Sequence, residues 1–309
     1  MIVLTHQIAD IILRTESDIL IPHLQENPFE QFRISEKDPD IFIRIRRLDP
    51  ITKDMTDSNK KECKVFSSFI GFQKSWLDNP ILQSPRVRAR LHECRDKPDQ
   101  VIFRITARGV MIHDFVKNEL DIFYDPGLKN YFDGPLVAAG YRNLISSFLP
   151  NFNAAMIHGA GVMVNGFAAL FLAPDEGGKT TVVRQPYFSP VLNDDQIILR
   201  NDGNVVFSHG TPFGPITSGP CGTRLDAIFL LDKGSCFTLN PVKLEDILNF
   251  LWDEHVHHRI FLPKNMKITL FEILSTACHQ ALTYRMSFQK EYVDWNMICK
   301  VMEDNCAGK

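Results

Sequence analysis

The stretch AALFLAPDEGGKTTVVR, residues 168–184, decides how the second half of this chain is expected to fold. Its apolar beginning, Ala168–Leu172, is typical of a short buried strand. A turn with adjacent glycines at Gly177-Gly178 follows, and Thr180–Arg184 has the composition of a short helix. A strand, a glycine-rich turn and a helix in this order are the context that a phosphate-binding loop requires.

The end of this loop carries the residue types that bind phosphate. Glycines let backbone N–H groups approach the negative charge, and a helix N-terminus adds a partial positive charge. Lys179 would reach the terminal phosphates, and Thr180 would place its hydroxyl on Mg²⁺. The loop departs from the motif because Ala173 replaces a glycine and because Asp175 and Glu176 add two carboxylates, the second at a position that would favour positive φ. The alternative is a glycine-rich helix entry with an exposed lysine.

A pair of adjacent carboxylates, Asp194-Asp195, begins fifteen residues after Lys179. The pair comes directly after the apolar Val191-Leu192, where a strand would end. In a phosphoryl-transfer site one carboxylate can hold Mg²⁺ while the other accepts the proton of the attacking hydroxyl. Exposed turns also contain such pairs, so it is the combination with the loop that favours phosphoryl transfer.

His158 lies in the extended apolar stretch Ala155–Val164, which leads into an Asn165-Gly166 hairpin turn before the loop. A histidine here could polarise the transferring phosphate or assist proton transfer. A lone histidine in an apolar strand is more often structural. The histidine-rich stretch at residues 255–258 is expected at the surface of a helix C-terminus, because no second cluster of ligands accompanies it.

The chain is expected to contain two regions, residues 1–127 and 128–309. Alternation of apolar and polar residues predicts a β-rich first region of unknown role. Fourteen of the 17 glycines lie between residues 127 and 234, which assigns any phosphate chemistry to the second region. Strands are predicted at 41–45, 101–105, 110–112, 120–124, 168–172, 197–200, 205–208, 227–231 and 284–288, and helices at 86–93, 136–148, 244–254, 270–283 and 292–302.

The composition excludes several classes of protein. A net charge of −3 argues against a dedicated nucleic-acid binder, which usually has a strongly basic domain. No apolar run approaches the roughly 20 residues of a membrane helix, and the N-terminus lacks the pattern of a signal peptide. Seven scattered cysteines without a CxxC pair are typical of reduced thiols, so a cytoplasmic protein without a membrane partner is expected.

Together, Ile157-His158-Gly159, Gly178-Lys179-Thr180 and Asp194-Asp195 resemble the C-terminal catalytic domain of HPr kinase/phosphorylase. The resemblance covers about residues 130–309. It implies an α/β (α+β) fold with mixed sheets, a P-loop domain akin to ATP-dependent phosphoenolpyruvate carboxykinase. Three further segments are typical of HPr kinase-related proteins: Gly210–Phe213, Ala227–Leu231 and Tyr284–Phe288. Such proteins occur in peptide-modification gene cassettes, including the SynChlorMet type.

The resemblance implies ATP and Mg²⁺ as cofactors and transfer of the γ-phosphate to a serine or threonine hydroxyl of a protein or ribosomal peptide. The family's hexamers imply a homo-oligomer. Relatives usually have Ser-Gly at 175–176, so the alternative is a degenerate binding module for a peptide or partner protein, with the loop disabled. The implied residues are Gly177, Gly178, Lys179, Thr180 and Thr181 for the nucleotide, Thr180 and Asp195 for the metal, and Asp194, Asp195 and His158 for catalysis.

Overall fold

The computed structural model describes residues 1–18, 20–47, 84–94, 101–106, 109–124, 135–185, 190–256, 262–289 and 292–306. Contacts between residues divide the chain into two compact units. The first unit contains residues 1–6, 11–26 and 33–144, and the second contains residues 7–10, 27–32 and 145–309. The boundary expected at residue 127 lies outside the described residues.

The first unit is built on a six-stranded mixed sheet in the order β1-β2-β3-β6-β5-β4. Strands β2, β3 and β6 run parallel to one another, whereas β5 pairs antiparallel with both β4 and β6. Residues 41, 43 and 45 of β3 are buried on one face, as the alternation predicts. The elements are β1 (Ile2–Ile8), β2 (Ile11–Ser17), β3 (Ile41–Arg47), α2 (Pro85–Cys94), β4 (Val101–Thr106), β5 (Gly109–Asp114), β6 (Glu119–Tyr124) and α3 (Pro135–Ser146), with 3-10 turns at Pro22–Leu24 and Phe29–Phe32.

Charged side chains link α2 to the sheet of the first unit. Arg44 of β3 donates to Asp121 at 2.6 Å and to Glu119 at 2.7 Å across the β3–β6 pair. Arg90 of α2 also donates to Glu119, at 2.8 Å, and forms an ion pair with Asp114. These buried and half-buried carboxylates are therefore neutralised by two arginines, as burial of charge requires.

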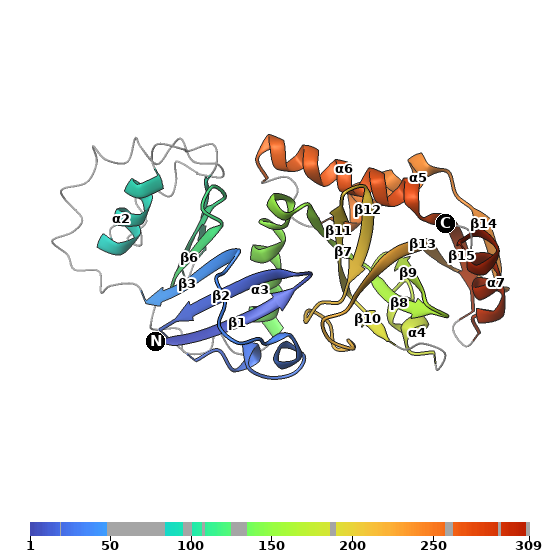
Figure 1. Ribbon diagram of the computed structural model, residues 1–309, viewed down its shortest axis with the longest axis horizontal. Coiled ribbons are helices and arrows are strands. Elements are labelled where there is room, and N and C mark those ends of the chain that lie inside the picture. Colours follow the sequence, from blue (N-terminus) through green and yellow to red (C-terminus); the bar gives the residue numbers. More distant parts are fainter. Residues whose placement is uncertain are drawn as a thin grey trace. The chain divides into compact units, whose positions relative to one another are not determined.

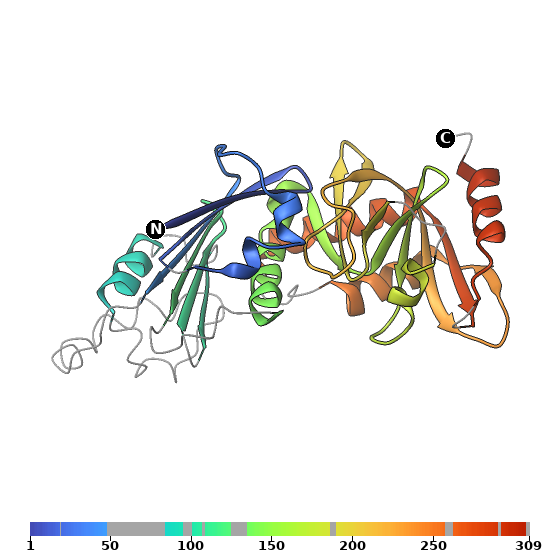
Figure 2. The same ribbon diagram turned by 90° about the horizontal axis from the view of Figure 1, so that it is seen from below.

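The second unit contains a nine-stranded mixed sheet (Figures 1 and 2). Its main path runs β10-β8-β9-β13-β12-β11-β7, and β15 pairs with both β13 and β14. The elements are β7 (Ala154–His158), β8 (Ala160–Val164), β9 (Phe167–Leu172), α4 (Lys179–Val183), β10 (Val191–Asn193), β11 (Gln196–Asp202), β12 (Val205–His209), β13 (Gly222–Lys233), β14 (Thr238–Pro241), α5 (Leu244–Phe250), a π-helical turn (Leu251–His255), α6 (Lys264–Gln280), β15 (Leu282–Phe288) and α7 (Trp295–Cys306), preceded by a 3-10 turn at Leu149–Phe152.

Three parallel strands, β9, β13 and β15, form the centre of this unit. The rings of Phe171 and Phe229 stack at 5.2 Å between their centroids, and Trp295 of α7 meets Phe171 edge-on. Helix α6 packs against β12, β11 and β7 (Figure 1). Leu172 pairs with Leu230, and Lys233 with Phe288, so the carboxyl ends of the three strands lie at one edge of the sheet.

The expected α/β class with mixed sheets is confirmed. The extended stretch predicted at 155–164 is instead two strands, because Gly159 breaks it and its N–H bonds to the Asp195 carbonyl at 3.0 Å. The helix predicted over 244–254 changes to π-helical geometry after Phe250, and the one predicted over 270–283 begins at Lys264. No described helix is long and apolar enough to cross a membrane.

Candidate active site

The glycine-rich loop joins the carboxyl end of β9 to α4 through a tight turn. The Gly177 N–H donates to the Pro174 carbonyl at 3.0 Å, and Glu176, the third residue of the turn, has φ of 61°. The positive φ expected at residue 176 is therefore confirmed. A side chain at Gly177 would place its Cβ 2.5 Å from that of Ala173, and Gly178 has φ of 105°, so both glycines are needed here.

Lys179 points back into its own loop. Its side chain is only 7% exposed, and Nζ donates to the carbonyls of Ala173 at 2.8 Å and Pro174 at 3.2 Å. Burial lowers the pKa of Lys179, and the charges of Asp175 and Asp195 act in the opposite direction. The interpretation of residue 179 as an exposed lysine is wrong, because the ammonium group is held among carbonyls and carboxylates.

The helix that follows the loop adds little electrostatic attraction for an anion. Helix α4 has only five residues, so few peptide dipoles align along it. Thr180 and Thr181 lie in its first turn and are half-buried. Binding of an anion at this loop must therefore depend on Lys179 and on the N–H groups of the turn more than on a helix dipole.

His158 and Asp195 come together at the mouth of this loop. His158 ends β7, and its Nε2 lies 3.1 Å from Oδ1 of Asp195 and 3.7 Å from Oδ1 of Asp175. The other oxygen of Asp195 accepts from Gln196 at 3.1 Å. His158 and Asp195 therefore meet beside Asp175 of the loop, and Asp195 lies close enough to Lys179 for its charge to act on the ammonium group.

The two adjacent aspartates have different surroundings. Asp194 is 3% exposed and accepts from the Ile216 N–H at 3.1 Å, and burial raises its pKa. Gly214 packs directly on its carboxylate, since a Cβ there would lie 2.6 Å from Oδ1. Asp195, in contrast, is about one-third exposed and faces His158. The loop over residues 210–217 therefore encloses Asp194, while Asp195 faces the site.

Asn193 organises the turn that carries the aspartates, a role that the sequence did not indicate. It is fully buried, and its Oδ1 accepts from the N–H groups of Asp195 and Gln196, both at 2.8 Å. Its Nδ2 donates to the Thr211 carbonyl at 2.8 Å. The only sequence signal was its place directly before the Asp-Asp pair.

His255 is buried, and its expected place at a helix surface is wrong. It is 1% exposed, ends the π-helical turn, and its Nδ1 bonds to the His158 carbonyl. The rings of the two histidines lie 6.0 Å apart. The extra residue of the π-helical turn rotates His255 toward β7 instead of solvent. His257 and His258 lie outside the described residues.

Two adjoining cavities open at the loop. One of about 150 Å³ is lined by residues 176–181, which include every residue predicted to bind the nucleotide. The other, of about 520 Å³, shares Glu176, Gly178 and Thr181 and is also lined by Lys233, Gly234, Phe288 and Gln289. This larger cavity lies where β9, β13 and β15 end, and carboxyl ends of parallel strands are common ligand sites in α/β folds.

A metal ion would need ligands from outside the protein here. Among the described residues, no three His, Cys, Asp or Glu side chains could together hold a metal ion. Thr180 and Asp195 supply oxygen donors of the kind that Mg²⁺ prefers, and Mg²⁺ commonly completes its shell with phosphate oxygens and water. The donor set therefore fits Mg²⁺ bound with a nucleotide.

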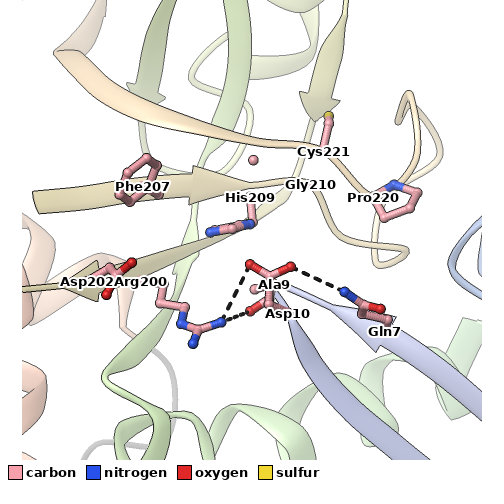
Figure 3. A pocket seen from close by; sticks show the side chains of 11 residues that line it. Gln7, Ala9, Asp10, Arg200, Asp202, Phe207, His209, Gly210, Pro220 and Cys221 are labelled. Carbon is pink, nitrogen blue, oxygen red and sulfur yellow. Dashed lines mark hydrogen bonds and ion pairs between the residues drawn. The ribbon is translucent and has the colours of Figure 1, made fainter. Parts of the chain in front are cut away.

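A separate cavity of about 390 Å³ lies elsewhere in the second unit, beside β11 and β12 (Figure 3). Arg200 donates to the Ala9 carbonyl at 2.8 Å and lies 3.6 Å from Asp10. Burial lowers the pKa of His209 and raises that of Cys221, so both are expected to be neutral at pH 7. None of the predicted site residues lines this cavity.

No protein-family model matches the chain, and no curated protein matches it either.

Proposed function

We propose that the chain is a cytoplasmic ATP-dependent kinase-like protein with a P-loop fold related to that of HPr kinase/phosphorylase. Its acceptor would be a serine or threonine hydroxyl of a protein or ribosomal peptide. The observation that carries the proposal is the convergence of His158, Lys179 and Asp195, which lie on separate segments, at the carboxyl end of β9. A buried lysine, a facing carboxylate and an adjoining histidine are the groups that phosphoryl transfer uses.

The chemistry is an in-line displacement at the γ-phosphorus of ATP. The acceptor oxygen forms a bond to phosphorus, the bond to the β–γ bridging oxygen breaks, and ADP leaves. Asp195 accepts the proton of the hydroxyl, and His158, 3.1 Å away, holds the carboxylate in place. Lys179 would leave its two loop carbonyls and neutralise charge on the transferring phosphate. Asp194, enclosed by the loop over 210–217, holds the shape of the site.

Thr180 is the side chain that would hold Mg²⁺ together with phosphate oxygens, since Asp195 serves as the base. The ion would supply neutralisation of phosphate charge. The cavity of about 520 Å³ next to the loop has room for the nucleoside part of ATP.

Calorimetric titration with ATP·Mg²⁺ tests the proposal on three proteins: wild type, Lys179→Ala and Lys243→Ala. Lys243, an exposed lysine of the same unit, is the control. Wild type and Lys243→Ala are expected to bind equally, and Lys179→Ala at least about tenfold more weakly, because it loses a charge-assisted contact. Absence of heat with wild type would refute the proposal. Binding that survives Lys179→Ala would show that the loop is not the phosphate site.

A second candidate function, a non-catalytic module that binds a peptide or partner protein, is favoured by one observation. Lys179 already donates to two carbonyls of its own loop, and Asp175 and Glu176 add negative charge beside it. In this case the fold would be retained without nucleotide chemistry. The same titration separates the two functions, since the module would give no heat with ATP·Mg²⁺ in any of the three proteins.

A further inference from the structure

Asp175 has a position in the loop that differs from that of its neighbour Glu176. It is the second residue of the turn closed by the Gly177 N–H and the Pro174 carbonyl. Its side chain is 90% exposed, yet Oδ1 lies 3.7 Å from Nε2 of His158. Glu176 is exposed too, and the structure shows no ion pair between it and any described residue. The turn therefore directs one of the two carboxylates toward the site.

The two groups near Asp175 are the ones that an incoming phosphate would contact. Nε2 of His158 lies 3.7 Å from the Asp175 carboxylate, and Lys179 Nζ donates at 3.2 Å to the carbonyl of Pro174, the residue directly before Asp175. A carboxylate and a phosphate oxygen both accept hydrogen bonds and both attract positive charge. The two anions would therefore compete for the same groups.

We propose that Asp175 weakens the binding of polyphosphate at this site, because its carboxylate lies beside His158, where the terminal phosphate of a nucleotide would also bind. This inference rests on the proposed function. It follows that the wild-type site binds a bare polyphosphate weakly and favours a ligand whose charge is reduced by a divalent cation. The effect is electrostatic and lies at an exposed side chain, so salt must weaken it.

The test compares the full-length Asp175→Asn and Glu176→Gln variants with wild type by calorimetry, with ATP·Mg²⁺, Mg²⁺-free tripolyphosphate and adenosine as probes. Asparagine keeps the size of the side chain and removes the charge. At low salt, Asp175→Asn is expected to tighten ATP·Mg²⁺ by roughly 3- to 10-fold, from Coulomb energies a few ångströms away in a solvent-rich site. The affinity for tripolyphosphate should increase by a larger factor, and the affinity for adenosine should not change.

Glu176→Gln is the matched control, because it removes the same charge one residue away. It is expected to change the Kd for ATP·Mg²⁺ by less than half the factor of Asp175→Asn, and about 0.5 M salt should remove most of both effects. Thermal unfolding of each variant checks that the fold is retained.

Two results would overturn the inference while leaving the proposed function intact. Weaker ATP·Mg²⁺ binding by Asp175→Asn would mean that the carboxylate contacts the ligand or its metal favourably. Equal effects of Asp175→Asn and Glu176→Gln would mean that only net charge matters. If wild type gives no heat with ATP·Mg²⁺, the proposed function itself fails, and the inference fails with it.

Discussion

Glu176 holds a backbone conformation that is unfavourable for any residue with a Cβ. Its φ of 61° is imposed by the turn that joins β9 to α4, at the place where such turns favour glycine. The left-handed region costs an L-residue about 1–2 kcal/mol, while glycine loses up to about 1 kcal/mol of chain entropy. Strain of this kind is concentrated at functional turns.

Replacing Glu176 by glycine is therefore expected to raise the free energy of unfolding by up to about 1 kcal/mol. Urea denaturation of the full chain measures it. Glu176→Ala is the control, because it removes the carboxylate and keeps the strain. A gain in Glu176→Ala equal to that in Glu176→Gly would attribute the effect to charge.

Replacing Asp195 by asparagine is expected to lower phosphoryl transfer at least about 100-fold, since a general base contributes roughly 10²–10⁴. Slow ATP hydrolysis, with water as the acceptor, is the assay that needs no known substrate. Asp232→Asn, on an exposed carboxylate that pairs with Arg285, should leave the rate unchanged. Full activity of Asp195→Asn would exclude residue 195 as the base.

His6 makes the stability of the first unit sensitive to acid. Burial lowers its pKa from 6.5 to about 4, and its Nε2 lies 3.1 Å from the Leu24 carbonyl. The unfolded chain takes up a proton on His6 near pH 6.5, and the folded chain does so only near pH 4. The free energy of unfolding is therefore highest above pH 6.5 and decreases as the pH falls toward 4. The loss is roughly 3 kcal/mol.

The difference in unfolding free energy between wild type and His6→Gln should therefore change by roughly that amount between pH 7 and pH 4. Urea titrations at several pH values measure it, with exposed His279→Gln as the control. A constant difference across this range would contradict the buried position of His6.

The elements show how far the sequence predicts this fold. Period-two alternation identified β3 and β6, and Asp202-Gly203-Asn204 identified the β11–β12 hairpin, whose turn has positive φ at Gly203 and Asn204. Strands β1 and β2 were not predicted. Their turn is formed by Ala9 and Asp10, both with positive φ, and neither is the asparagine or glycine that usually signals such a turn.

The candidate site was predictable in its residues but not in their arrangement. The loop and the aspartate pair each have a local signature, because phosphate and metal chemistry restrict the residue types that suit them. Which aspartate faces the site depends on the loop over 210–217, which folds over Asp194 from another part of the sheet. His255 has no local signature at all, since its burial follows from π-helical geometry.

His255 should be replaceable only at a cost in stability. Phenylalanine keeps most of the ring volume and loses the bond from Nδ1 to the His158 carbonyl, so His255→Phe is expected to lower the free energy of unfolding by about 1–3 kcal/mol. His279→Phe is the matched control, because His279 bonds to the Ser275 carbonyl at an exposed position. It should cost less than about 0.5 kcal/mol. Equal effects of the two changes would argue against a buried contact.

The two compact units do not correspond to two continuous pieces of chain. The second unit includes residues 7–10 and 27–32 as well as everything from residue 145 onward. Phe29 illustrates why, since it is fully buried and its ring meets that of Phe213 edge-on at 5.6 Å. The early segments therefore contribute to the core of the unit that carries the candidate site.

Phe29→Ala is expected to destabilise the second unit by about 3–5 kcal/mol, as removal of a buried phenylalanine usually does. Hydrogen exchange followed by mass spectrometry locates the effect: protection should fall around residues 205–219 and remain in β3 of the first unit. Exposed Val205→Ala is the control. Loss of protection in β3 alone would contradict the assignment of Phe29 to the second unit.

The second unit is formed from three separate stretches of the chain, which affects both its folding during synthesis and its transfer by recombination. Residues 7–10 and 27–32 are synthesised before the strands that they pack against, so they reach their final contacts only after the rest of the unit has been made. A crossover at residue 145 would not transfer the second unit whole, since residues 7–10 and 27–32 would stay with the first unit. A single crossover that separates the two units would therefore be expected to remove part of the core of the second unit.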